Sequence, residues 1–275
     1  MRALLATDLD GTLLSAERRA SERDLASLRD LAAAGVCRAA VTGRSLHSAR
    51  RVLPPDFPID YLVFSSGAGT LHWPTGELLA SQSIPAADVA RAVDILLAQR
   101  ANFMVHNLVP DNHRFRHHES IGEATDFRRR RDYDPAAARP LVPNEPLGEA
   151  SQLLAVIPLD LARLAALRAA LADFQVVRTT SPLDAESIWV EIFPAGVSKA
   201  SGCAWLAEHL RIPREQTFCL GNDYNDLDML EWGTHAAVVA NAPADLRARF
   251  PATASHNHDP LTAACQTWGL LAKTE

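Results

Sequence analysis

The sequence predicts an α/β protein in which a parallel-sheet domain carries an inserted α+β module. Short apolar runs alternate with helix-like segments in the first third of the chain and again in the last third, whereas the middle has a mixed pattern. Strands that are separated by helices imply right-handed crossovers and a parallel sheet. The length of 275 residues allows one large domain or two modest ones.

The first third predicts three strands and two helices. Three short apolar runs are typical of buried strands: residues 3–7, 36–41 and 61–65. Ser21 is a candidate N-cap for a helix that continues with apolar residues at helical spacing until Gly35. We expect a second helix from about residue 45 to residue 53, where Pro54 follows.

The last third repeats this alternation. We expect helices at 197–210 and 225–232, strands at 217–220 and 236–240, and two further helices opened by Pro243 and by Asp259 with Pro260.

The middle of the chain predicts a separate module. We assign residues 81–189 to an α+β module and residues 1–80 plus 190–275 to the parallel-sheet core. Residues 187–193 predict a strand with two different faces, because Ile188, Val190 and Ile192 alternate with Trp189, Glu191 and Phe193.

Composition narrows the class of protein. The formal charge of −6 argues against a dedicated nucleic-acid-binding protein. No apolar run is long enough for a transmembrane helix, and Asp8 comes too early for a signal peptide. We interpret the four scattered cysteines as buried thiols of a cytoplasmic protein. We therefore expect neither nucleic acid nor membrane as a partner, and the sequence predicts no particular oligomeric state.

Carboxylates follow the first predicted strand and one of the last. Asp8 and Asp10 come directly after residues 3–7, and two residues apart in extended backbone they point the same way. A second acidic cluster, residues 221–226, follows the strand at 217–220. Each cluster alone could be a solvated turn or a helix cap. Together at the carboxyl edge of a parallel sheet they favour a ligand site, because a cation would offset their charge.

Two further signals lie at matching positions. Thr42, Gly43, Arg44 and Ser45 follow the second strand and open a helix, where a hydroxyl and free amides suit an oxyanion. Lys199 lies near a helix start, where its charge opposes the helix macrodipole. Alone, these residues are explained by helix capping and by an ordinary surface lysine.

The order of these motifs resembles the haloacid dehalogenase-like superfamily. The motifs are Asp8-Leu9-Asp10-Gly11-Thr12, Thr42-Gly43-Arg44, Lys199 and Gly221-Asn222-Asp223-Tyr224-Asn225-Asp226. The insert between the second and third motifs resembles the type-II (IIB) cap of the Cof-like phosphatase branch. Residues 63–68 are similar to that branch's strand ending in Asn-Gly-Ala, with Ser66 in place of Asn, and residues 240–243 match another Cof-like segment. The resemblance implies a Rossmann-like core and an α+β cap that closes over the active site.

The resemblance also implies a magnesium-dependent phosphatase of small phosphorylated metabolites, such as sugar phosphates. Asp8 would form an aspartyl-phosphate, and Asp10 would act as general acid and base. The implied catalytic residues are Asp8, Asp10, Thr42 and Lys199. The implied phosphate-binding residues are Thr42, Gly43, Arg44, Lys199 and Asn225.

The implied metal site departs from the family pattern. Mg²⁺ would bridge Asp8 and a phosphate oxygen, with the backbone carbonyl of Asp10 as a further ligand. The family has Asp where this chain has Asn222, so either Asn222 or Asp223 could take that place. Asp226 would orient a metal-bound water or Lys199. The implied metal set is Asp8, Asp10, Asn222, Asp223 and Asp226.

Several alternatives stay open. The same core could support a phosphomutase, and Asn222 would suit a non-catalytic protein that senses a phosphorylated ligand. A dinucleotide-binding redox protein is disfavoured because no G-x-G-x-x-G follows a strand. In the middle module, the histidine spacing matches no usual zinc site. The four arginines at 128–131 are either a self-compensated charge run or a clamp for a second anionic group of the substrate.

Overall fold

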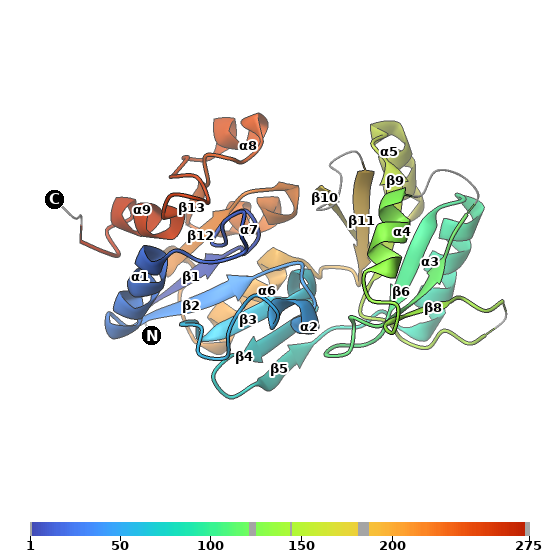
Figure 1. The fold of residues 1–275 in the computed structure, drawn as a ribbon, viewed down its shortest axis with the longest axis horizontal. Coiled ribbons are helices and arrows are strands. Elements are labelled where there is room, and N and C mark those ends of the chain that lie inside the picture. Colours follow the sequence, from blue (N-terminus) through green and yellow to red (C-terminus); the bar gives the residue numbers. More distant parts are fainter. Residues whose placement is uncertain (1, 121–124, 144, 181–186, 273–275) are drawn as a thin grey trace. The chain divides into compact units, whose positions relative to one another are not determined.

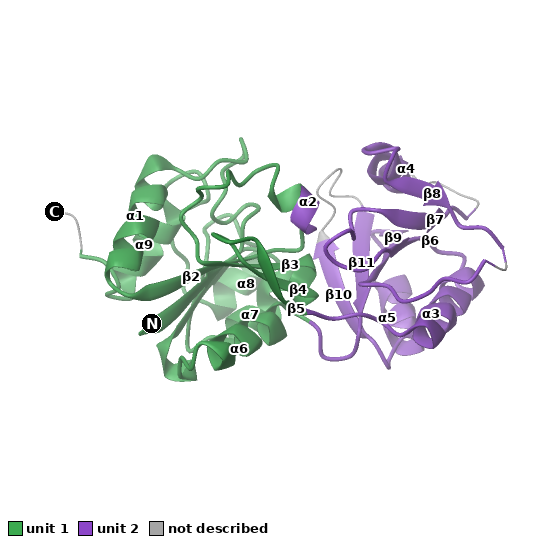
Figure 2. Ribbon diagram, turned by 90° about the horizontal axis from the view of Figure 1, so that it is seen from below, with its two compact units in different colours: residues 1–44, 48–80, 198–275 green, residues 45–47, 81–197 purple. Residues whose placement is uncertain are grey.

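The computed structural model describes residues 2–120, 125–143, 145–180 and 187–272. The chain forms two compact units (Figure 2): a core of residues 1–44, 48–80 and 198–275, and a cap of residues 45–47 and 81–197. The boundary that we predicted at residue 190 is too early. It would cut the strand β11 (Ser187–Phe193), which pairs along its length with two other cap strands.

The core is built on one mainly parallel sheet. In the described residues its strand order is β13-β12-β1-β2-β3-β4-β5. The parallel strands are β1 (Ala3–Thr7), β2 (Val36–Val41), β3 (Tyr61–Phe64), β12 (Thr217–Gly221) and β13 (His235–Val238). The strand β4 (Gly69–His72) runs antiparallel to β3, and β5 (Glu77–Ser81) follows at the edge. The predicted parallel sheet is confirmed, and it aligns the carboxyl ends of β1, β2 and β12.

Helices cover both faces of the core sheet (Figures 1 and 2). On one face α1 (Glu22–Ala33), capped by Ser21, packs on α9 (Pro260–Thr267). On the other lie α6 (Lys199–His209), α7 (Leu227–Trp232) and α8 (Ala244–Arg249), whose apolar side chains join one buried cluster with β1 and β2. The cysteines are confirmed as buried and free. Among the described residues, no helix could cross a lipid bilayer.

One local prediction for the core is wrong, and a second holds only in part. The helix expected over 45–53 is short, α2 (Leu46–Ala49), and turns follow it, with Val52 and Leu53 both donating to the carbonyl of Ala49. Asp259 and Pro260 do stand at the N-cap and first position of α9, as predicted, but Asp259 has a left-handed backbone (φ 50°) and its side chain makes no capping hydrogen bond.

The cap contains a second sheet with helices on both faces. Its described strand order is β10-β11-β9-β6-β7-β8, with bounds β6 (Asn102–His106), β7 (Phe115–His118), β8 (Ala138–Pro140), β9 (Leu153–Pro158) and β10 (Gln175–Thr180). One face packs against α3 (Ala86–Ala98) and α5 (Leu161–Ala170), and the other packs against α4 (Thr125–Asp132) (Figure 2). The two faces predicted for β11 are confirmed. Val190 lies in the apolar cluster on the side of α3 and α5, and Trp189 packs against the apolar cluster on the side of α4.

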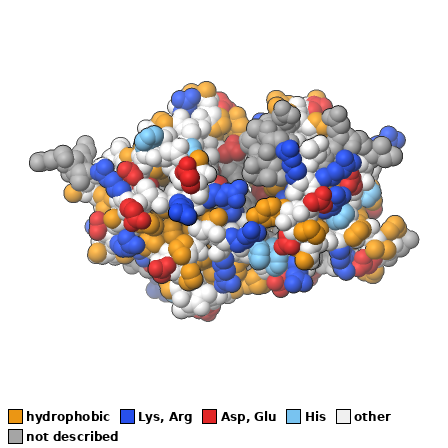
Figure 3. Space-filling view, in the orientation of Figure 1, with side chains coloured by type: hydrophobic (Ala, Val, Ile, Leu, Met, Phe, Trp, Pro, Cys, Tyr) orange, Lys and Arg blue, Asp and Glu red, His pale blue; other side chains and the backbone are white. Residues whose placement is uncertain are grey.

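The arginine run lies on α4, and two of its four side chains form ion pairs within the cap. Arg128 and Arg131 both pair with Glu119, and Arg131 also pairs with Asp132. The guanidinium of Arg130 lies 4.9 Å from the centre of the Phe115 ring. Basic and acidic side chains are also interspersed on the face shown in Figure 3. These contacts favour the self-compensated interpretation of the run over the anion clamp.

His106 makes the stability of the cap pH-dependent. Its side chain is buried on β6, and Nδ1 lies 2.7 Å from the carbonyl oxygen of Asn112. Burial, reinforced by the charge of Arg130, lowers the pKa of His106 to about 3. An unfolded histidine titrates near pH 6.5. Titration of His106 therefore has little effect on the free energy of unfolding well above pH 6.5, where the residue is neutral in both the folded and the unfolded chain. As the pH falls from 6.5 towards 3, the unfolded chain alone gains the proton, which costs about 2 kcal/mol at pH 5.

The substitution His106→Gln tests this assignment. Glutamine retains an N–H donor for Asn112 but does not titrate, so the free energy of unfolding in urea should fall less between pH 7 and pH 5 than it does in the wild type. His118→Gln, at a partly exposed position of the neighbouring strand, is the matched control and should keep the wild-type slope. Identical slopes for the wild type and His106→Gln would contradict the assignment.

Candidate active site

The predicted motifs meet at the carboxyl edge of the core sheet. Asp8 follows β1, and its N–H donates to the carbonyl of Leu220 in β12 (2.9 Å). Lys199 begins α6, and Asp226 ends the short 3-10 helix η3 (Tyr224–Asp226). The Nζ of Lys199 lies 2.7 Å from Oδ1 of Asp8 and 2.6 Å from Oδ1 of Asp226. Residues that are far apart in the sequence thus form one cluster, Asp8–Lys199–Asp226.

Burial strengthens the electrostatics of the cluster. The Lys199 side chain is fully buried. Burial alone would lower its pKa, but the carboxylates of Asp226 and Asp8 outweigh this effect and raise it, so the ammonium stays charged. Burial and the charge of Asp226 raise the pKa of Asp8 to about 7, although Lys199 acts in the opposite direction. When both carboxylates are ionised, two negative charges face one positive charge, and the site attracts a further cation.

Asp226 holds the late loop as well as Lys199. Its Oδ2 accepts the N–H groups of Asn222 (2.7 Å) and Asp223 (3.1 Å), while Oδ1 contacts Lys199. Asp223 caps η3, because its Oδ1 accepts the N–H of Tyr224.

Asn222 lies against the loop that follows β1. The hydroxyl of Thr12 donates to its Oδ1 (3.1 Å), and a Cβ at Gly11 would lie only 2.7 Å from its Nδ2. Gly11 also has a positive φ of 70°, so the turn and this close approach both require glycine. Asn241, from the predicted Cof-like segment, donates to the carbonyl of Gly11 (2.9 Å). Asn222, one of the two candidate positions, therefore contacts the loop of Asp8.

Asp10 takes a partner of its own. Although we expected Asp8 and Asp10 to point the same way, the chain turns between them, and Asp10 forms a bidentate ion pair with Arg44 (2.6 and 2.5 Å). Thr42 is buried, and its hydroxyl accepts the N–H of Arg44 (3.1 Å). Gly43 lies between them at the end of β2, and Asn225 is half-buried within η3.

Two anchors of this site were not among the predicted residues. Asp228 accepts the N–H of Ala200 (3.1 Å), which ties α7 to the first turn of α6. Ser198 caps α6 through a reciprocal pair of bonds with Ser201. The spacing of Ser198 and Ser201 is that of a capping box, so this anchor was visible in the sequence.

The segment Ser65–Gly67 packs closely against the start of α6. Ser66 adopts a left-handed conformation (φ 52°), which explains why Asn suits this position in the family pattern. The N–H of Ser66 donates to the carbonyl of Thr42 (2.9 Å). At Gly67 the φ is 103°, and a Cβ there would lie 2.2 Å from the carbonyl oxygen of Ser198.

Gly67→Ala should therefore displace the start of α6. We expect a loss of about 3 kcal/mol in the free energy of unfolding, because the methyl group meets backbone that cannot move aside cheaply. Gly35→Ala is the matched control: its φ of 76° is also left-handed, but its Cβ would meet no atom within 4 Å. We expect about 1 kcal/mol for that change. Equal losses in urea unfolding would contradict the close packing at Gly67.

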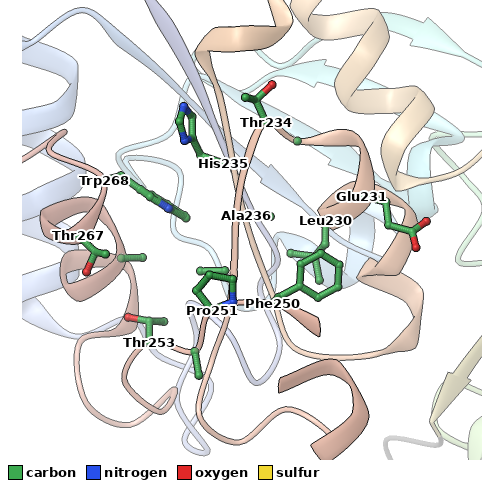
Figure 4. A pocket seen from close by; sticks show the side chains of 14 residues that line it. Leu230, Glu231, Thr234, His235, Ala236, Phe250, Pro251, Thr253, Thr267 and Trp268 are labelled. Carbon is green, nitrogen blue, oxygen red and sulfur yellow. The ribbon is translucent and has the colours of Figure 1, made fainter. Parts of the chain in front are cut away.

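A separate cavity of about 530 Å³ lies beside β13 (Figure 4). Its wall includes Leu230, Phe250, Pro251 and Trp268, and Glu231 is its acidic residue. None of the predicted site residues lines it, and its lining contains His235 but no lysine or arginine. We therefore place the candidate active site at Asp8, Lys199 and Asp226.

The donor atoms at the site fit a hard divalent cation. The carboxylate of Asp8, the amide oxygen of Asn222 and the backbone carbonyl of Asp10 are oxygen donors of the kind that such a cation prefers, and they would be its ligands. Within the described ranges, no three His, Cys, Asp or Glu side chains are grouped as metal ligands. A cation here would therefore depend on amide, carbonyl and water oxygens in addition to the carboxylate.

An aspartate beside a buried lysine lies at the carboxyl edge of a parallel sheet, which is where open α/β folds bind their ligands. The model of the haloacid dehalogenase-like hydrolase family matches residues 5–261, and the chain belongs to this family.

Relatives and solved structures agree with this membership. The chain is 27% identical to the putative phosphatase YxeH of Bacillus subtilis, over 94% of each chain. It is 26% identical to the HMP-PP phosphatase of Cronobacter sakazakii, over 96% of this chain and 92% of that one. The solved HAD subclass IIB sugar phosphatase BT4131 has the same fold, with a TM-score of 0.76 at 18% identity over 98% of this chain and all of that one. The expected Cof-like branch and type-IIB cap are confirmed.

Proposed function

We propose that this protein is a Mg²⁺-dependent phosphatase of small phosphorylated metabolites that works through an aspartyl-phosphate on Asp8. The Asp8–Lys199–Asp226 cluster is the observation that carries this proposal. It combines a nucleophile with a fixed positive charge in a buried place, where electrostatic interactions are strong. The HMP-PP and sugar phosphatases among the similar proteins support the substrate class.

Asp8 and Asp10 would divide the chemistry between them. Lys199 holds one oxygen of Asp8, and the other oxygen would attack phosphorus. The bond from phosphorus to the ester oxygen breaks, and Asp10, which has taken up a proton before this step, gives that proton to the leaving alcohol. Asp10 then takes a proton from water, which attacks phosphorus and breaks the bond to Asp8, so that phosphate is released.

The remaining residues would bind phosphate and hold the cation. Thr42, Gly43, Arg44, Lys199 and Asn225 are the proposed contacts for the phosphoryl oxygens. Mg²⁺ would be held by Asp8, Asn222 and the carbonyl of Asp10, and would supply positive charge beside the phosphoryl group. Because both oxygens of Asp226 already accept hydrogen bonds and Asp223 caps η3, we assign these two residues to positioning.

Phosphate release from 4-nitrophenyl phosphate, with Mg²⁺ and with EDTA, tests the proposal. A panel of sugar phosphates and phosphorylated pyrimidines then narrows the substrate. We expect release that depends on Mg²⁺. Phosphoryl transfer to a second position without free phosphate would indicate the phosphomutase instead, and binding without turnover would indicate the ligand sensor.

The proposal places the enzyme in the cytoplasm, which its four buried, unpaired thiols favour.

A further inference from the structure

Arg44, which we predicted to bind phosphate, also forms an ion pair with Asp10. Nε of Arg44 lies 2.6 Å from Oδ2 of Asp10, and the terminal nitrogen NH2 lies 2.5 Å from Oδ1. Both oxygens of Asp10 are therefore engaged by one planar guanidinium. This fork geometry fixes the plane as well as the position of a carboxylate.

Arg44 is the more firmly held member of the pair. Its NH1 nitrogen lies 3.0 Å from the hydroxyl of Ser48, and its backbone contacts Thr42 and Ser65. Its side chain is 16% exposed, whereas that of Asp10 is 48% exposed. A carboxylate exposed to this degree would sample several rotamers without a rigid partner. The orientation of Asp10 is therefore set by Arg44.

We infer that Arg44 is a positioning residue for Asp10, and this inference rests on the proposed function. It fixes the plane of the carboxylate in the ionised form that the ion pair shows, and Asp10 takes up a proton before it protonates the leaving alcohol. Phosphate binding by Arg44 would serve every phosphate ester equally. Positioning of Asp10 would speed the hydrolysis of some esters more than others. An alkyl alcohol must be protonated in order to leave, whereas 4-nitrophenolate leaves without a proton.

The value of kcat/KM for two substrates separates these uses, since it reports the steps up to departure of the alcohol. For Arg44→Gln we expect kcat/KM to fall about 30-fold or more with glycerol 1-phosphate and less than about 5-fold with 4-nitrophenyl phosphate. Arg44→Lys retains the charge but loses the fork, and should give an intermediate loss with glycerol 1-phosphate.

Arg38→Gln is the matched control. Arg38 forms a second bidentate ion pair in the core, with Asp60 (3.0 and 2.6 Å), and its side chain also donates to the carbonyl of Leu28. The Arg38→Gln substitution should leave the ratio of the kcat/KM values for the two substrates unchanged. Equal losses with both substrates for Arg44→Gln, no loss, or a gain would each overturn the inference while the proposed function stands. A wild-type enzyme that releases phosphate from neither substrate would overturn the proposed function and this inference with it.

Discussion

Asp8→Asn is expected to lower phosphate release from 4-nitrophenyl phosphate by at least about 1,000-fold, because an amide oxygen cannot act as the nucleophile. The substitution preserves the shape of the side chain and its contact with Lys199. It also removes one of the two negative charges that share Lys199, so we expect the folded protein to be retained. Steady-state rates with saturating Mg²⁺, together with urea unfolding, measure both effects.

Asp30→Asn is the matched control for Asp8→Asn. Asp30 lies on the exposed side of α1, so the same chemical change there should leave the rate within about twofold of the wild type. A folded Asp8→Asn variant that still turned over at a tenth of the wild-type rate would exclude Asp8 as the nucleophile.

Lys199→Met is expected to cost about 3–5 kcal/mol in the free energy of unfolding, because it leaves two buried carboxylates without their shared cation. Methionine fills a similar volume, so the loss reports charge and not packing. The same variant should lose phosphatase activity, since nothing then offsets the repulsion between Asp8 and the phosphate. Urea unfolding and rate measurements on one preparation test both results.

A second substitution keeps this prediction testable if Lys199→Met folds poorly. In the double variant Lys199→Met, Asp226→Asn, one charge of each sign is removed, and part of the lost stability should return. Activity should not return, because Asp8 still lacks its cation. A loss below about 1 kcal/mol for Lys199→Met alone would contradict the buried cluster.

The sequence carried enough information to predict the core of the site. Each motif has a local signature: an acidic pair after an apolar run, a Thr-Gly before a helix, an acidic loop after a late strand. Parallel connections bring such strand ends to one edge, so the meeting of Asp8 and Asp226 followed from topology. A further signal was available, since Lys199 is one of only two lysines among 27 basic residues.

The partners of individual side chains could not be predicted in this way. The pairing of Arg44 with Asp10 depends on how two loops are packed, and Asp10 alone could equally face a cation or solvent. Glu119 forms ion pairs with both Arg128 and Arg131, although Asp132 is nearer to each of them in the sequence. The end of the cap was misplaced for a similar reason: β11 has the apolar alternation of a core strand, and only its pairing with β9 and β10 assigns it to the cap.

The phosphorylated enzyme itself offers the most direct test of the central claim. Wild-type protein is mixed with substrate and Mg²⁺, quenched in acid within milliseconds and digested, and the peptide of residues 3–18, released by cleavage after Arg2 and Arg18, is analysed by mass spectrometry. We predict an acid-stable, hydroxylamine-sensitive phosphoryl group on Asp8, absent from Asp8→Asn. Phosphate attached to any other residue, or turnover with no phosphorylated peptide at any quench time, would contradict a nucleophilic Asp8 held by Lys199.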